Sequence, residues 1–64
     1  MISVEWVGIF FSEMDNDRTV RMTFHGWDLE DVNRQIRGFV EHMEDNPKYD
    51  YILKESQIKH IEET

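Results

Sequence analysis

The first hydrophobic pattern along the chain has the period of a β-strand and covers residues 2–11. Apolar and polar residues alternate from Ile2 to Trp6, so that one face is apolar and the other polar. The alternation breaks at Gly8, after which Ile9–Phe11 are all apolar. A break of this kind indicates either a β-bulge or a stretch of strand that is covered on both faces.

A second strand pattern follows a polar turn. Residues 14–18 are rich in turn formers, and residues 19–25 alternate again. We expect Val20, Met22 and Phe24 to face inward and the polar residues between them to face outward. The two strand patterns together predict a β-hairpin.

The pattern of an amphipathic helix begins at Asp28. This residue is a good N-cap, Asp31 lies three residues later, and Trp27 and Val32 occupy the two positions of a hydrophobic staple. Pro47 ends the helix, because the residue before a proline is pushed away from helical angles. The apolar residues that recur at helical spacing are Leu29, Val32, Ile36, Phe39, Val40 and Met43.

The outer face of this helix is polar. Glu30 precedes Arg34 in the i,i+4 order that stabilises a helix. Gly38 lies in the middle of the same face, where it costs up to about 1 kcal/mol relative to alanine. No local feature offsets that cost.

Residues 49–64 carry two patterns at once. From Tyr49 to Leu53 the apolar residues alternate as in a strand, whereas Ile58 and Ile61 keep a helical spacing. We favour a strand, because a hairpin with one helix on one face gains a third strand more easily than it accommodates a second helix. A break near Glu55-Ser56 would divide this segment into two short strands.

The patterns therefore predict an α+β fold in the order β-β-α-β, a three-stranded antiparallel sheet with one helix packed on one face. A chain of 64 residues forms a single domain, residues 1–64. Such a domain buries only about 60% of the surface that its unfolded chain exposes. It has no cysteine, so neither a disulfide nor a thiolate-bound metal adds stability. A homodimer or a bound partner would do so.

Charge narrows the class of partner. Fourteen acidic and seven basic residues give a net charge of −7. This field repels nucleic acid phosphates and anionic membranes, so we expect no direct binding to either, and it attracts a basic surface on a partner protein. The N-terminal run contains Glu5 and lacks a basic region, unlike a signal peptide or a membrane span. With the missing cysteines, this indicates the cytoplasm.

The acidic residues fall into groups at the hairpin tip, the helix start and the helix end. Glu44 and Asp45 are unusual, because the helix dipole opposes acids at a helix C-terminus. If the groups share one side of the fold, they present carboxylates as DNA presents phosphates; the alternative is that turns, the dipole and solubility explain them. The candidate partner-binding residues are Asp15, Asp17, Glu30, Asp31, Glu41, Glu44 and Asp45.

Aromatic residues offer a second route to binding. Trp6, Phe10, Phe11, Tyr49 and Tyr51 are more than a sheet covered on one face needs. Either some of them are exposed on the uncovered face, where they would form a partner-binding patch or a homodimer face, or the register shifts at the glycine in the first strand and all of them reach the core.

The chain carries no pattern typical of catalysis or metal binding. His25, His42 and His60 are scattered, and adjacent carboxylates such as Glu62 and Glu63 point in different directions. A glycine-rich phosphate loop and a nucleophile elbow are both missing from the sequence. We therefore expect no enzymatic activity, no metal and no cofactor.

The layout, the charge and the run Phe24-His25-Gly26-Trp27-Asp28-Leu29-Glu30-Asp31 give the whole chain a resemblance to known proteins. It resembles the small acidic inhibitors of host enzymes that bacteriophages encode, and is similar in layout to the uracil-DNA glycosylase inhibitors of Bacillus phages and to a small RNA polymerase inhibitor of a coliphage. The resemblance implies a virus-encoded or accessory protein that blocks a host nucleic-acid enzyme or defence complex. It assigns no residue a role.

Two hypotheses follow. The first is a non-enzymatic inhibitor or adaptor, possibly a DNA mimic, that presents carboxylates with aromatic support to a basic partner. The second is a small structural or assembly protein that self-associates through the open sheet edge or the uncovered sheet face.

Overall fold

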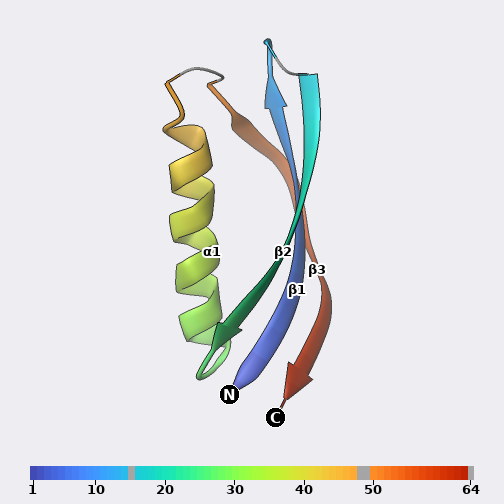
Figure 1. Cartoon of the computed structure of the whole chain (residues 1–64), viewed down its shortest axis with the longest axis vertical. Helices are drawn as coiled ribbons and strands as arrows, with labels where there is room; N and C mark the ends of the chain where they lie inside the picture. Colours follow the sequence, from blue (N-terminus) through green and yellow to red (C-terminus); the bar gives the residue numbers. More distant parts are fainter. Residues whose placement is uncertain (15, 48–49, 64) are drawn as a thin grey trace.

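The protein is a three-stranded antiparallel sheet with one helix across one face, as a computed structural model describes it for residues 1–14, 16–47 and 50–63 (Figure 1). The order of elements confirms the predicted β-β-α-β fold. Asp15 and Tyr49, which the sequence singled out, lie outside the described residues. The elements are β1 (Ile2–Ser12), β2 (Asn16–Gly26), α1 (Leu29–Glu44) and β3 (Ile52–Glu63).

The first strand is the centre of the sheet, since the strand order is β2-β1-β3. β1 and β2 form the predicted hairpin and pair along their full length, from Ile2 opposite Gly26 to Ser12 opposite Asn16. In β2 the side chains of Val20, Met22 and Phe24 face inward and the polar residues between them are exposed, as predicted.

Of the two alternatives for the break at Gly8, the bulge is wrong. β1 alternates through this residue, and every even-numbered position from Ile2 to Ser12 is buried toward the helix. Glycine is required there because the Trp6 indole lies over the backbone: a Cβ at Gly8 would lie 2.3 Å from Trp6 Cη2. The apolar residues that followed the apparent break belong to both faces of one regular strand.

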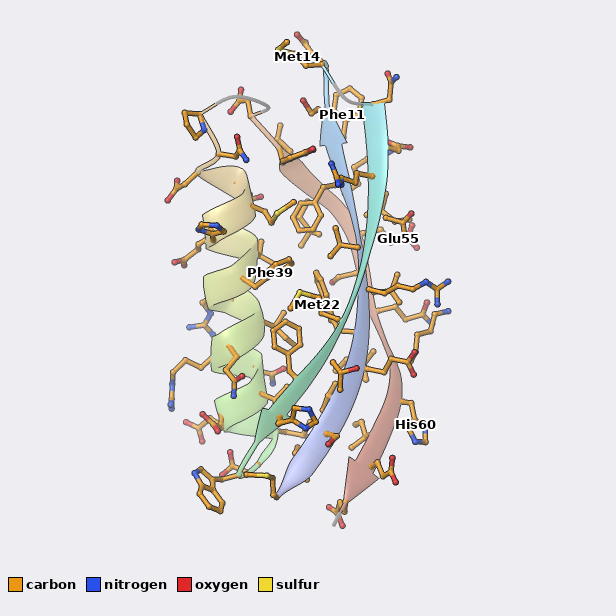
Figure 2. The ribbon with its side chains drawn as sticks, in the orientation of Figure 1. Phe11, Met14, Met22, Phe39, Glu55 and His60 are labelled. Carbon is orange, nitrogen blue, oxygen red and sulfur yellow. The ribbon has the colours of Figure 1, made fainter. Side chains whose placement is uncertain are left out.

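The core lies between the sheet and α1. The Phe39 ring points from the helix into the sheet (Figure 2) and makes edge-to-face contacts with Trp6, Phe10 and Phe24, at centroid distances of 5.9, 6.3 and 6.1 Å. Aromatic pairs in this geometry stabilise a core beyond the area that they bury. The buried core residues are Ile2, Val4, Trp6, Phe10, Phe24, Val32 and Tyr51.

The helix begins as predicted at its N-cap, Asp28. The Asp31 backbone N–H donates to Asp28 Oδ1 at 2.9 Å, and the Trp27 N–H donates to Asp31 Oδ2 at 3.1 Å. The predicted hydrophobic staple is wrong, because the Trp27 side chain is 77% exposed. Val32 packs instead against the backbone of Gly26, where an added Cβ would lie only 2.9 Å from Val32 Cγ2.

The helix ends close to the expected place. Asp45 is the C-cap, and its N–H donates to the Glu41 carbonyl at 2.9 Å. On the outer face, Arg34 Nη1 lies 3.6 Å from Asp31 Oδ1, so this arginine pairs with an acid three residues away rather than with the predicted Glu30.

The last strand is continuous over 12 residues, so the break expected near Glu55-Ser56 is wrong. The pairing of β3 with β1 instead has two irregularities that flank this place, one between Leu53 and Glu55 and one between Ile58 and His60. Each is a β-bulge that adds one residue to β3, so residues three apart share a face. This explains the helical spacing of Ile58 and Ile61 in a strand.

Candidate protein-binding site

The sheet has an uncovered face on the side opposite α1, which we call the open face. Val7, Ile9 and Phe11 lie along its centre, at the positions of β1 that alternate with the buried ones. Val7 and Ile9 are half-buried, and Phe11 is 37% exposed. We call these three side chains the apolar ridge.

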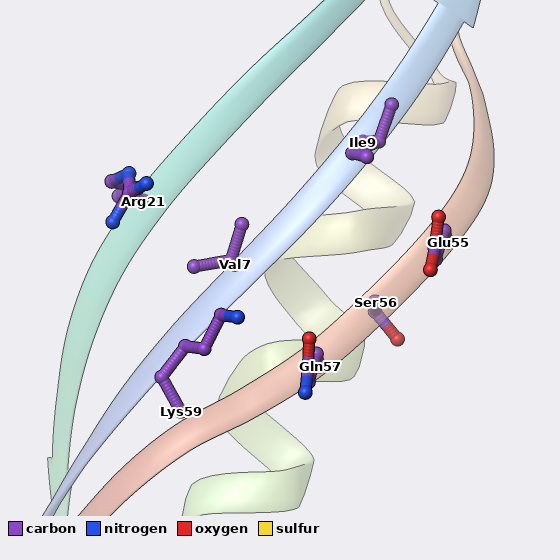
Figure 3. A pocket seen from close by; sticks show the side chains of 7 residues that line it. All are labelled: Val7, Ile9, Arg21, Glu55, Ser56, Gln57 and Lys59. Atoms are coloured by element: carbon purple, nitrogen blue, oxygen red, sulfur yellow. The ribbon is translucent and has the colours of Figure 1, made fainter.

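A shallow hollow of about 170 Å³ crosses the apolar ridge (Figure 3). Arg21 of β2 and Gln57 of β3 lie opposite Val7 on its two sides, and Glu55 lies opposite Ile9. The residues that line the hollow are Val7, Ile9, Arg21, Glu55, Ser56, Gln57 and Lys59.

Three charged side chains around the hollow make no ion pair. Arg21, Glu55 and Lys59 form no salt bridge or hydrogen bond through their side chains within the described part of the chain. They come from the two outer strands and are exposed. The arrangement can therefore offer an apolar centre with two cations and one anion that are available to another molecule.

One end of the ridge is covered by an ion pair. Lys54 Nζ donates to both carboxylate oxygens of Asp17 at 3.2 Å and lies 5.9 Å from the centroid of the Phe11 ring. The cation thus lies near the aromatic ring and leaves part of it exposed.

The aromatic residues divide between the two expected outcomes. Trp6, Phe10 and Tyr51 are buried in the core, and Phe11 is exposed on the open face. No register shift in β1 was needed to bury the first two, because both occupy even-numbered positions of a regular strand.

The structure does not bring the predicted carboxylates that lie within the described residues to one surface. Asp17 lies on the open face and binds Lys54. Asp31 holds the start of the helix and Arg34. Glu30 is exposed near Arg34, beside an open hollow of about 370 Å³ on the outer face of the helix.

Of the four other predicted carboxylates, Asp15 lies outside the described residues and three lie at the C-terminal end of α1. Glu44 Oε2 accepts a hydrogen bond from the Leu53 N–H at 3.2 Å and so ties the helix to the start of β3. This explains an acid that the helix dipole disfavours. Glu41 and Asp45 are exposed, and their side chains make no ion pair with a described residue. An α-helix rises 1.5 Å per residue, so Glu30 and Glu41 lie about 16 Å apart along it.

Sequence reasoning identified this site in part. Exposed aromatic residues on the uncovered face beside Arg21 were one of its two expectations, and Phe11 fits it, but Val7, Ile9, Glu55 and Lys59 were not identified. The run Ile9–Phe11 left open a bulge or a stretch covered on both faces, although parity carried the signal. Odd-numbered residues of the first strand are polar at Ser3 and Glu5 and apolar from Val7 onward, which is the pattern of a strand whose second face is partly apolar.

None of the three histidines lines the hollow. Ser3 Oγ and His25 Nδ1 lie 2.8 Å apart, and His60 Nε2 lies 4.0 Å from Glu62 Oε2. In residues 1–14, 16–47 and 50–63, no three histidine, aspartate or glutamate side chains gather as a metal-binding group. Within the same residues, no helix is long and apolar enough to cross a membrane.

Comparisons with protein-family models, with curated proteins and with solved structures give no match for this chain.

Proposed function

We propose that this chain is a non-enzymatic protein-binding protein, an inhibitor or adaptor, that contacts its partner through the open face. The observation that carries the proposal is the apolar ridge with three charged neighbours that pair with no side chain among the described residues. Protein interfaces commonly combine an apolar centre with a polar rim. A soluble domain gains nothing in its own stability from Arg21, Glu55 and Lys59, since none of them makes an ion pair within the described residues.

The shape of the open face favours binding over catalysis. The hollow is shallow and is lined by side chains of the three strands of the sheet. A catalytic carboxylate needs a desolvated cleft that shifts its proton affinity, whereas Glu55 is exposed. A protein surface of matching shape, with an apolar centre and charges opposite to Arg21 and Glu55, fits this face better than a small substrate does.

The resemblance to small acidic phage inhibitors supports the same class of function, a phage or accessory protein that blocks a host protein. We place this function in the cytoplasm, where a chain without cysteines needs no disulfides. The binding partner on this view is a protein, with neither nucleic acid nor membrane as a direct ligand.

The test uses two charge reversals that alter different faces. Arg21→Glu changes the open face, and Arg37→Glu makes the same change on the outer face of the helix, where Arg37 lies beside the larger hollow. Wild-type chain and both variants are immobilised and exposed to bacterial lysate, and retained proteins are identified by mass spectrometry. We expect a partner that binds the wild type and Arg37→Glu alike and binds Arg21→Glu at least tenfold less. Equal retention by the two variants would argue against the open face.

A second candidate is a DNA-mimic inhibitor that uses the end of α1. The observation that favours it is the position of Glu41 and Asp45, exposed carboxylates where the helix dipole disfavours them and where no described side chain pairs with them. A basic protein surface would bind there. Arg34 and Arg37 interrupt the acidic residues along the helix, so this candidate needs only the C-terminal end.

A further inference from the structure

The outer edge of β3 has no neighbouring strand. β3 pairs with β1 on one side, and the strand order β2-β1-β3 leaves its other side without a strand among the described residues. Apart from Leu53, every residue of β3 is exposed. A long unpaired edge presents a row of backbone N–H and C=O groups that can pair with another strand.

Half of β3 is also uncovered on its helix-facing side. The N-terminal end of α1 lies near β2, where Gln35 Nε2 donates to the His25 carbonyl at 2.7 Å, and its C-terminal end reaches β3 through Glu44. Figure 1 shows β3 diverging from α1 toward the C-terminus. As a result Ile58 and Ile61, which pair with buried Trp6 and Val4, remain 41% and 45% exposed.

Because of the two bulges, the side chains of β3 do not alternate regularly between the two faces of the sheet. Pairing with β1 places Leu53, Ser56, Ile58 and Ile61 on the helix side. The residues on the open face include both added lysines, since Lys54 binds Asp17 there and Lys59 lines the hollow. The open-face residues of β3 are Ile52, Lys54, Glu55, Gln57, Lys59, His60 and Glu62.

This order is symmetric about Gln57. Counting outward in both directions from this residue, the side chains at equal distances share a face: helix side at one residue, open face at two and at three, helix side at four and open face at five. Opposed residues of an antiparallel pair must lie on the same face. Antiparallel self-pairings centred anywhere else between residues 55 and 59 oppose residues from different faces.

We infer that a second copy of this chain pairs with β3 along this edge, antiparallel, with the two-fold axis at Gln57. Glu55 then lies opposite Lys59 of the second copy, and the symmetry gives this opposite-charge pair twice. Pairs of opposite charge directly across two strands stabilise a sheet. Both residues lack an ion pair within the described residues of one chain.

The helix side of this pairing is apolar where the single chain is exposed. Leu53 lies opposite Ile61 of the second copy, and Ser56 lies opposite Ile58 of the second copy. Because the strands are antiparallel, the half of β3 that its own helix covers lies beside the uncovered half of the other strand. The C-terminal end of the second helix is therefore brought toward Ile58 and Ile61. Burying such side chains is favourable because it removes apolar area from water.

Bulges and edge lysines also protect proteins against indiscriminate strand pairing. On β3 the bulges exclude the neighbouring registers of antiparallel self-pairing, but in the register centred on Gln57 all opposed side chains share a face. The edge of β2 has no comparable reason to pair, since α1 already covers Phe24, which is 7% exposed. A second copy is thus the occupant that matches both the charges and the uncovered residues of the β3 edge.

The dimer goes beyond the proposed function. The two-fold axis is perpendicular to the sheet, so both helices lie on one side and both apolar ridges on the other. A partner bound to the open face would meet a six-stranded surface on which the apolar ridges and Arg21 remain available, whereas Glu55 and Lys59 pair with the second copy. Arg21→Glu therefore tests the open face without changing the β3 edge.

The first experiment measures the mass of the full chain by sedimentation equilibrium over a range of concentrations. We expect a dimer of the 7.8 kDa chain. Glu55→Lys and Lys59→Glu, each alone, should weaken dimerisation at least tenfold, and the double swap should restore it, because it re-creates both pairs. A chain that stays monomeric at millimolar concentration would overturn the inference and leave the edge to a strand of another protein.

The second experiment reads the register directly. The chain has no native cysteine, so Gln57→Cys introduces a single thiol at the axis, where opposed Cα atoms about 4.5–5.5 Å apart allow a disulfide. Glu55→Cys is the matched control on the same face, with its copy about 13 Å away along the strand. We expect rapid oxidation to a covalent dimer for Gln57→Cys alone. Equal cross-linking of both variants, or a dimer in which neither cross-links, would overturn the register. If Gln57→Cys cross-links as expected but Arg21→Glu retains the lysate partner as well as the wild type does, only the open-face proposal fails.

Discussion

Lys54 of β3 reaches across the central strand to Asp17 of β2, with its Nζ 3.2 Å from each carboxylate oxygen. Phe11 of β1 lies beneath this contact, so each of the three strands contributes one side chain. The first of the two bulges in β3 makes the contact available, since it adds Lys54 to the open face. The ion pair therefore belongs to the same irregularity that shapes the edge of the sheet.

The strength of this ion pair is predicted to be small. Its side chains are 50% and 55% exposed, and exposed pairs contribute about 0.2–1 kcal/mol. A double-mutant cycle with Lys54→Met and Asp17→Asn, measured by urea denaturation, should give a coupling free energy in that range that falls as salt is added. A coupling that is independent of salt would show that packing on Phe11, rather than charge, joins these residues.

Two glycines should respond to alanine in opposite directions. Gly38→Ala should raise the free energy of unfolding by up to about 1 kcal/mol, because a Cβ there meets nothing within 4 Å. Gly8→Ala should lower it by about 1–3 kcal/mol, because the Cβ would collide with the Trp6 indole. Thermal and urea denaturation of both variants measure the changes. A destabilised Gly38→Ala chain would mean that the outer face of the helix is packed against something.

The start of the helix offers a third prediction. Asp28→Ala removes the N-cap acceptor of the Asp31 N–H and should cost about 1 kcal/mol. Trp27→Ala is the matched control and should change the stability by less than about 0.5 kcal/mol, since an exposed side chain away from special contacts contributes little. The midpoints of urea denaturation are compared for the two variants, whose unfolding free energies should depend equally steeply on urea concentration. A larger loss of stability for Trp27→Ala would show that the Trp27 side chain packs as a hydrophobic staple after all.

Two acidic residues at the end of α1 should differ in their contribution to stability. Glu44→Ala removes the acceptor of the Leu53 N–H and should cost about 0.5–1.5 kcal/mol. Asp45→Lys reverses a charge that the helix dipole disfavours and should leave stability equal or higher by about 0.3–1 kcal/mol. Urea denaturation tests both expectations.

The same Asp45→Lys variant tests the DNA-mimic candidate. If a basic partner binds the end of α1, the association rate should fall with the charge reversal and with added salt, whereas the dissociation rate changes less. Surface plasmon resonance at low and moderate salt measures both rates for the captured partner. Rates that are unaffected by both the substitution and the salt would remove this candidate.

The sequence by itself determined the order of the elements and the buried sides of β2 and α1. Alternation in residues 19–25 and the N-cap at Asp28 depend on local chemistry, so the hairpin and the helix start follow from short windows of sequence. The stripe from Val32 to Met43 also identified the helix face that packs on the sheet, since burial follows helical periodicity.

Only the tertiary structure decided which apolar residues would be left uncovered. Phe11 is exposed on the open face because one helix covers one side of the sheet, and Ile58 and Ile61 are exposed because that helix crosses the sheet at an angle. The bulges in β3 arise from pairing with β1, and together they exchange the faces of residues 55–59, which a pattern of fixed period cannot represent. The roles of the acidic residues were equally ambiguous in the sequence. Asp31 and Glu44 cannot be told from the other acidic residues until the backbone groups that they bind are known.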